Sequence, residues 1–129
     1  MRGFADALEL ANVAVVAERA EILGRDPRHR ESFDLVTARA CAALPILVEY
    51  TMPLLRIGGS LVAWKGRISD DELRGGGAAA STLGGGEPVV RPTGFEVLGD
   101  HRFVTVAKER GTSGIYPRRP GEPGRRPLG

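Results

Sequence analysis

Apolar residues recur along this chain at two spacings, one typical of strands and the other typical of helices. Largely apolar runs of strand length occupy residues 13–17, 33–38 and 60–64. Apolar residues three and four positions apart mark residues 4–11 as helical, and residues 18–23 begin a helical turn. The chain therefore alternates helices with strands, which favours an α/β fold with parallel strands.

A further helix is predicted between the second and third strands, over residues 44–55. Its proline at position 45 fits a first helical turn. Pro53 cannot continue a helix, so we expect this one to end near Thr51 or Met52.

The segment after the third strand carries conflicting signals. Ser69 and Glu72 have the spacing of a capping box, which opens a helix. Six of the twelve residues 75–86 are glycine, and each glycine costs a helix up to about 1 kcal/mol relative to alanine. We therefore expect a weak or broken helix within a flexible surface segment.

The last third of the chain predicts a hairpin followed by a tail. Residues 88–98 and 101–107 have strand character and are separated by a Gly99-Asp100 turn, which predicts an antiparallel pair. Residues 111–129 contain four prolines and five glycines and show no periodicity, so no regular structure is expected there. We accordingly divide the chain into a domain over residues 1–109 and a tail over residues 110–129.

Charge distinguishes the two parts. Residues 1–107 hold 12 basic and 14 acidic residues, whereas residues 108–129 hold six basic and two acidic ones. A cationic tail on a near-neutral body indicates a polyanionic partner. The single cysteine, Cys41, excludes a disulfide framework and a multi-cysteine zinc site, so no metal is expected.

No membrane segment or export signal is expected. No stretch approaches the roughly 20 apolar residues of a membrane span. The first ten residues lack the apolar region of a secretory signal, and we expect a cytoplasmic protein.

Four segments, in order, resemble one known family. They are Arg19-Ala20-Glu21, residues 33–40 with Leu44-Pro45, residues 58–66, and residues 116–121 with 125–128. Together they are similar to the small-subunit ribosomal RNA methyltransferase G family, also called glucose-inhibited division protein B. The resemblance implies the C-terminal part of a doubly wound, Rossmann-like methyltransferase sheet with a terminal antiparallel hairpin. It also implies methyl transfer from S-adenosyl-L-methionine to N7 of a guanosine in 16S ribosomal RNA.

The chain departs from the family in one respect. The glycine-rich loop that binds the methionine part of the cofactor has no counterpart in this sequence. About two βα units of roughly 30 residues each are missing before the strand at 13–17. The activity of the chain alone is therefore open, and the alternative is a non-catalytic RNA-binding fragment of such an enzyme.

The resemblance makes Ala20, Glu21 and Arg39 cofactor-binding residues. Ligands of open α/β sheets bind beyond the carboxyl ends of the strands, where these residues are expected. A guanidinium at position 39 suits the methionine carboxylate or the RNA. The structural alternative for Arg39 is an ion pair with Asp34 or Glu49.

The candidate RNA contacts are basic. Lys65 follows the third strand, where it suits a phosphate or the guanine, while Trp64 is expected to pack. The tail contributes Arg118, Arg119, Arg125 and Arg126, whose alternative interpretation is a solvated tail without a partner. The N7 atom of guanine has a free lone pair and no proton, so alignment is needed more than a general base. The catalytic residues stay unassigned.

Overall fold

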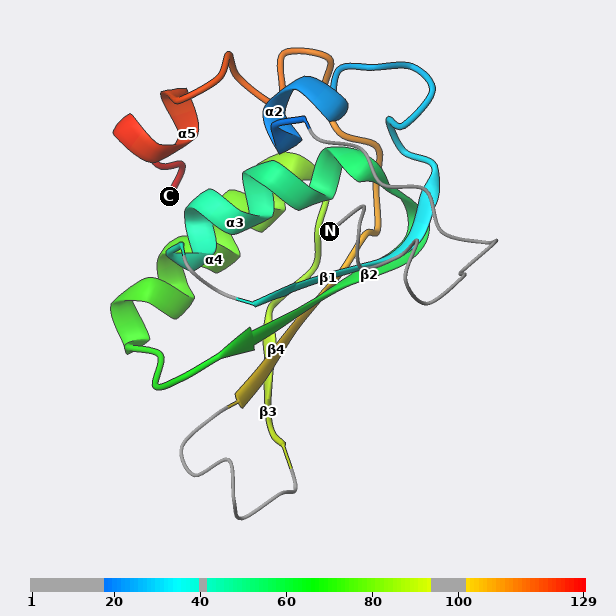
Figure 1. Cartoon of the computed structure of the whole chain (residues 1–129). Helices are drawn as coiled ribbons and strands as arrows, with labels where there is room; N and C mark the ends of the chain where they lie inside the picture. Colours follow the sequence, from blue (N-terminus) through cyan, green and yellow to red (C-terminus); the bar gives the residue numbers. More distant parts are fainter. Residues whose placement is uncertain (1–17, 40–41, 94–101) are drawn as a thin grey trace, which may run out of the picture.

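A computed structural model describes residues 18–39, 42–93 and 102–129. Its elements, in chain order, are α2 (Ala20–Leu23), β1 (Phe33–Arg39), α3 (Leu44–Thr51), the 3₁₀ turn η1 (Met52–Leu54), β2 (Leu55–Lys65), α4 (Asp70–Leu83), β3 (Val89–Pro92), β4 (Arg102–Ala107) and α5 (Glu122–Arg125) (Figure 1). The expected helix at 4–11, the strand at 13–17 and the Gly99-Asp100 turn lie outside the described residues, as does Cys41.

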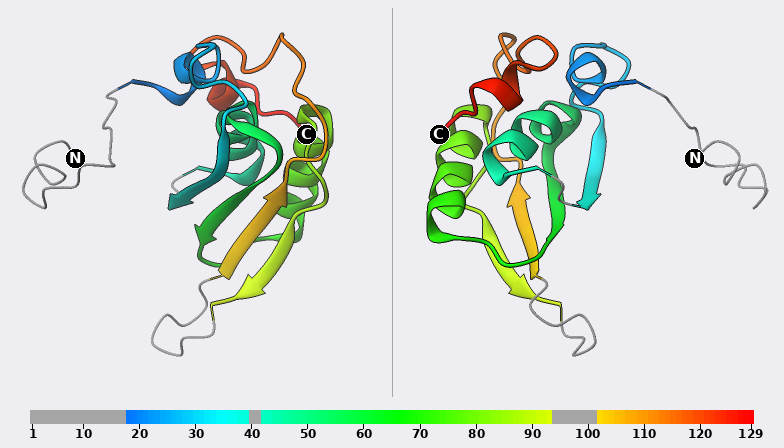
Figure 2. Two further views of the ribbon diagram at one scale, coloured as in Figure 1. Left: turned by 90° about the vertical axis from the view of Figure 1, so that its right-hand side faces the viewer. Right: turned by 60° about the vertical axis from the view of Figure 1, so that its left-hand side comes forward.

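The described strands form one mixed sheet in the order β1-β2-β4-β3. Strands β1 and β2 are parallel, and β4 runs antiparallel to both β2 and β3. The predicted pairing of the two last strands is confirmed, with Val89 opposite Thr105 and Pro92 opposite Arg102. The protein is therefore a mixed α/β structure, and β1 is an edge strand of the described sheet (Figure 2).

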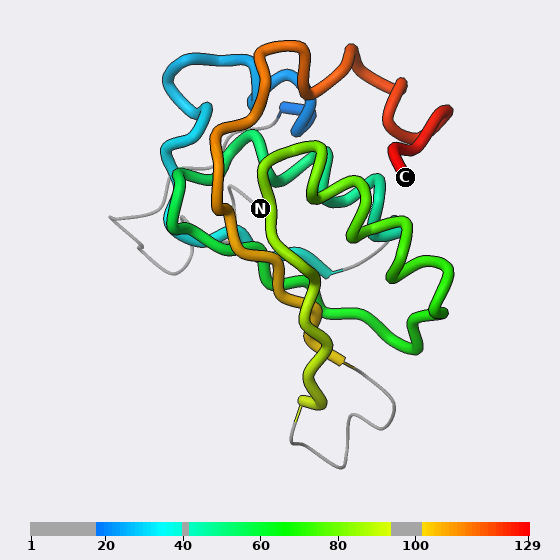
Figure 3. The backbone as a smooth tube through the Cα atoms, turned by 180° about the vertical axis from the view of Figure 1, so that it is seen from behind, coloured from blue at the N-terminus to red at the C-terminus, as the bar shows by residue number. Residues whose placement is uncertain are grey.

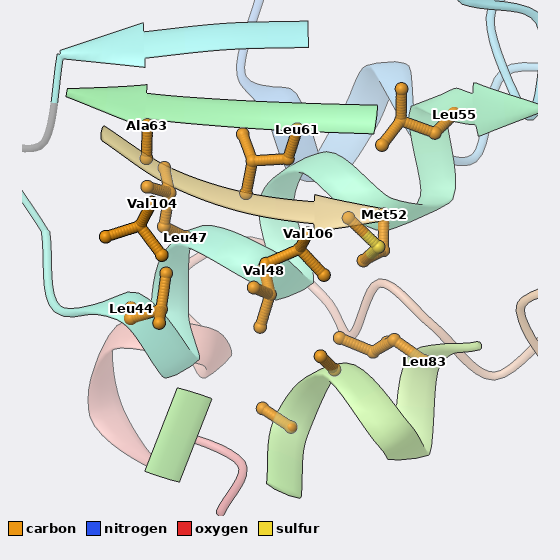
Figure 4. Packing of buried hydrophobic residues seen from close by; sticks show 12 residues of the cluster. Leu44, Leu47, Val48, Met52, Leu55, Leu61, Ala63, Leu83, Val104 and Val106 are labelled. Carbon is orange, nitrogen blue, oxygen red and sulfur yellow. The ribbon is translucent and has the colours of Figure 1, made fainter. Parts of the chain in front are cut away.

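Helices α3 and α4 lie on the same face of the sheet and enclose the core with it (Figure 2). Leu61 and Ala63 of β2, and Val104 and Val106 of β4, alternate with outward-facing neighbours, as the period of a strand requires. They meet buried side chains of the two helices and of η1, among them Leu44, Val48, Met52 and Leu83 (Figure 4).

The predicted end of α3 is confirmed. The helix ends at Thr51, and Pro53 lies in the 3₁₀ turn that leads directly into β2. Strand β2 begins at Leu55, earlier than the expected residue 60. Gly58 within it has a positive φ of 92°, and the register with β1 shifts between the pair of Phe33 with Leu55 and the pair of Leu35 with Ser60.

Helix α4 contradicts the expectation of a weak or broken helix. It begins at Asp70, where Ser69 Oγ accepts a hydrogen bond from the Glu72 amide, and continues for 14 residues to Leu83. A Cβ atom on Gly76 would lie 2.3 Å from Cδ2 of Leu44, so the glycine permits close approach of α3 and α4. Tertiary packing therefore offsets the low helix propensity of the glycines.

The C-terminal segment is also more structured than expected. Residues 122–125 form α5, so the expectation of no regular structure is wrong there. The segment runs from the end of β4 past α2 and back along α3 (Figure 3). Pro117 and Pro123 are buried, and Leu128 packs against the core.

Candidate functional site

Arg39 is the last residue of β1. Its aromatic neighbours Trp64 and Phe103 lie on the sheet face that α3 and α4 leave uncovered. Its guanidinium carbon is 5.4 Å from the centre of the Trp64 ring. Trp64 in turn contacts Phe103 with ring centres 6.2 Å apart and an interplanar angle of 60°. These three residues are register partners across β1, β2 and β4, so they form one row across the sheet.

A cavity of about 290 Å³ opens at this row. It is lined by Thr37, Ala38, Arg39, Val62, Trp64 and Phe103. Asp34 pairs with Arg56 and Glu49 pairs with Arg118, so both carboxylates considered as partners of Arg39 are engaged elsewhere. The arginine is exposed and can offer its guanidinium to an anionic ligand.

Glu21 lies in α2 and is only 3% exposed. Its Oε2 accepts hydrogen bonds from Arg19 Nη2 at 2.8 Å and from the Gly121 amide at 3.0 Å. Burial alone would raise the pKa of Glu21, but the bonds from the Gly121 amide, its own amide and Arg19 together lower it. These bonds together favour the charged form of the carboxylate, and the C-terminal segment contributes one of them, from the Gly121 amide.

The structure does not bring Ala20 and Glu21 together with Arg39. Helix α2 lies near the end of α3, where Gly24 is close to Pro53, whereas β1 ends near the start of α3 (Figure 1).

Lys65 is buried at the end of β2. Its Nζ donates to the carbonyl of Ala42 at 3.0 Å and forms an ion pair with Glu72. Glu72 Oε2 also accepts from the Leu44 amide at 2.9 Å. Lys65 thus joins the end of β2 to the starts of α3 and α4, and its amine points into the protein.

The tail arginines divide into two groups. Arg118 is turned inward: its guanidinium bonds both oxygens of the fully buried Glu49, with Nη2 to Oε1 at 2.7 Å and Nε to Oε2 at 3.0 Å. Arg119, Arg125 and Arg126 have side chains that are 81%, 66% and 83% exposed. Each lies 3.5 to 3.9 Å from a carboxylate oxygen of Glu122, so the three form one exposed cluster.

Arg30 is a structural residue that sequence reasoning missed. Its guanidinium donates to four main-chain carbonyls, those of Gly24, Thr112, Ser113 and Tyr116, at 2.6 to 3.0 Å. Nothing in the polar loop that precedes β1 distinguishes this arginine from its neighbours. Its partners are more than 80 residues away in sequence, apart from Gly24, so only the fold reveals them.

The part of the chain that the structure describes shows neither a metal-binding cluster nor a membrane-spanning helix. It contains no cluster of three or more histidine, cysteine, aspartate or glutamate side chains able to hold a metal ion. None of its helices has the length and apolar character needed to cross a membrane.

Comparison with known proteins identifies the family. The family model for rRNA small subunit methyltransferase G matches residues 1–93. The chain is 53% identical to the ribosomal RNA small subunit methyltransferase G of Deinococcus deserti, over 99% of this chain and 53% of that protein. It is 46% identical to the protein of that name from Deinococcus radiodurans, over 99% of this chain and 51% of that protein.

The relative from Roseiflexus castenholzii is 46% identical over 94% of this chain and 52% of its own length. The chain thus spans about half the length of the curated relatives it matches. With the family model covering most of the chain, the conclusion is that the protein belongs to the rRNA small subunit methyltransferase G family.

Proposed function

We propose that this chain forms part of an enzyme that transfers a methyl group from S-adenosylmethionine to N7 of a guanosine in 16S ribosomal RNA. Family membership supports the reaction class, because the relatives are named as methyltransferases of small-subunit ribosomal RNA. The observation that carries the proposal is Arg39, an exposed guanidinium at the carboxyl end of a parallel strand and beside a cavity.

Arg39 fits the cofactor chemically. Ligands of parallel sheets bind beyond the carboxyl ends of the strands, and a guanidinium can bond a carboxylate with two parallel hydrogen bonds. The methionine part of the cofactor carries such a carboxylate, and its sulfonium supplies the methyl group. Because the carboxylate of Glu21 is engaged with Gly121, we assign any contact from Ala20 and Glu21 to their main chain.

The proposed RNA contacts come from the exposed arginines. Arg119, Arg125 and Arg126 present guanidinium groups to solvent, as phosphate binding requires. Lys65 is engaged with Glu72 inside the protein, and Arg118 with Glu49. Because N7 needs no deprotonation, the contribution of the three exposed arginines is to hold the RNA so that N7 lies in line with the methyl group.

We further propose that the sheet is the C-terminal part of a doubly wound sheet. Strand β1 is an edge of the described sheet, and its exposed residues include Phe33 and Leu35. The relatives have about twice the length of this chain, which leaves room for further strands beside β1.

A second candidate function is RNA binding without methyl transfer. The exposed arginine cluster favours it, because that cluster lies wholly within the described C-terminal segment. We expect the chain alone to bind S-adenosylmethionine weakly, because its sequence contains no glycine-rich cofactor loop.

The test of the proposed cofactor site is a chimera in which this chain replaces the matching half of the Deinococcus deserti relative. Calorimetric titration with S-adenosylmethionine should show that Arg39→Ala weakens binding by about 10- to 150-fold, the effect of losing a charged hydrogen bond. Arg39→Lys should recover only part of the affinity.

Arg56→Ala is the matched control, because Arg56 is also exposed but pairs with Asp34 on the neighbouring strand. It should leave the cofactor affinity unchanged. An Arg39→Ala chimera with unchanged cofactor affinity and weakened RNA affinity would transfer Arg39 from the cofactor site to the RNA site.

A further inference from the structure

Three glutamates of the body accept main-chain hydrogen bonds from the C-terminal segment. Glu21 accepts from the amide of Gly121 at 3.0 Å, and Glu49 accepts from the amide of Arg118 at 2.9 Å. Glu31 accepts from the amide of Thr112 at 3.2 Å. We call these three carboxylates the carboxylate clamp. It holds the segment through its backbone, at three points along ten residues.

Two arginines of the body complement the clamp by binding carbonyls of the same segment. Arg30 donates to the carbonyls of Thr112, Ser113 and Tyr116 at 2.6 to 3.0 Å. Arg25 donates to the carbonyl of Ile115 at 3.0 Å. The segment is therefore fixed by side chains of the body, although it has little secondary structure of its own.

Arg118 attaches the segment to the body through an ion pair with a buried carboxylate. Its guanidinium forms a two-point pair with Glu49, which has no exposed surface, and its Nη2 also donates to the carbonyl of Arg126 at 2.6 Å. This last bond connects the attachment directly to the exposed cluster around Glu122. Arg118 thus fixes the main chain of Arg126, whose own side chain faces solvent.

We propose that Glu49 and Arg118 are positioning residues, which hold Arg119, Arg125 and Arg126 as a preorganised phosphate-binding surface. This inference rests on the RNA binding in the proposed function. A surface ordered before binding loses less conformational entropy when RNA binds than three arginines on a loose tail would. The three exposed arginines determine how many phosphates are contacted. The clamp raises the affinity for RNA further, because it orders these arginines before binding.

The two roles differ in how RNA affinity depends on salt. Each phosphate contact to a single strand contributes about 0.7 to the slope of log K against log salt concentration. Arg119→Ala removes a contact and should reduce the slope by about 0.7. Arg118→Ala leaves all three contacting arginines in place, so it should weaken binding at fixed salt by about tenfold with an unchanged slope.

The experiment measures binding of a single-stranded oligoribonucleotide to the whole chain at several salt concentrations. Amide hydrogen exchange over residues 112–121 is measured on the same variants. Arg118→Ala should accelerate exchange at Thr112 and Gly121, and Arg118→Lys should do so less, because an ammonium cannot bond both carboxylate oxygens. Arg74→Ala is the control, since Arg74 is exposed and pairs with Asp71 on α4.

Arg118→Lys also serves if Arg118→Ala unfolds the chain, because it keeps a cation beside Glu49. A reduced slope for Arg118→Ala, with unchanged exchange at residues 112–121, would make Arg118 a direct phosphate contact and overturn the positioning role. Unchanged exchange and unchanged RNA affinity for Arg118→Lys would overturn it as well. A third outcome is accelerated exchange in the Arg118 variants together with no salt-dependent RNA binding by the wild-type chain. It would retain the clamp but overturn both the phosphate surface and the RNA contacts of the proposed function.

Discussion

The two lysines of the chain both lie inside the folded protein. Lys108 is 1% exposed, and its Nζ donates to the carbonyls of Met52 and Leu55 at 2.6 and 2.9 Å. It therefore satisfies two carbonyls at the junction of η1 and β2. Burial lowers the pKa of Lys108, because the charged amine is removed from water.

This lowered pKa predicts a pH dependence of stability. Between the lowered pKa of folded Lys108 and the ordinary value of 10.5, the unfolded chain binds more protons than the folded one. The free energy of unfolding of the wild type should therefore rise with pH in this window, relative to that of Lys108→Met. Urea denaturation at several pH values measures the difference, and a difference that stays constant or falls would contradict the burial effect.

Lys65 shows which part of a site the sequence determines. Its place at the end of the strand was predicted correctly, since β2 ends at Lys65. The direction of its side chain was not predictable from this strand, because the run Leu61–Trp64 is apolar at every position and gives no alternation to distinguish the two faces. The inward direction follows from the helices that cover one face, which Lys65 shares with Leu61 and Ala63.

At the scale of elements, α4 depends on its contact with α3. The capping box at Ser69 predicted where the helix begins, but not that it continues through three successive glycines. Propensity describes an isolated helix, whereas the close approach of Gly76 to Leu44 belongs to the packed protein.

Two neighbouring glycines give a matched test of this packing. Gly76→Ala places a methyl group 2.3 Å from Leu44 Cδ2 and should lower the free energy of unfolding by roughly 1–3 kcal/mol, through overpacking. Gly77→Ala meets no atom closer than 3.5 Å and should raise it by up to about 1 kcal/mol, through helix propensity. Equal gains in urea denaturation for both variants would show that α3 and α4 are not in close contact.

At the scale of the whole molecule, the sheet has one covered face and one uncovered face within the described residues. On the edge strand β1, the side chains of Phe33 and Leu35 are 41% and 56% exposed. An unpaired edge with apolar side chains promotes association with another strand. The parallel strands were predictable from the alternation of helices and strands, and the antiparallel pair from the predicted hairpin. The exposure of the other face depends on contacts that these patterns do not encode.

The exposed edge predicts self-association of the isolated chain. Sedimentation velocity should show oligomers that increase with protein concentration, and Leu35→Lys should reduce them, because a charge on an edge strand opposes pairing. Glu87→Lys, an exposed substitution away from this edge, is the control and should leave association unchanged. A wild-type chain that remains monomeric at all concentrations would show that the edge is already protected.

The most direct test of the account is the nucleoside composition of 16S ribosomal RNA after incubation with S-adenosylmethionine and the chimera that carries this chain. The account predicts 7-methylguanosine in that RNA by mass spectrometry, together with a marked loss of product when Arg39 is replaced by alanine and none when Arg56 is. Methylation of another atom or nucleoside, or 7-methylguanosine formed equally well by the Arg39→Ala chimera, would contradict it.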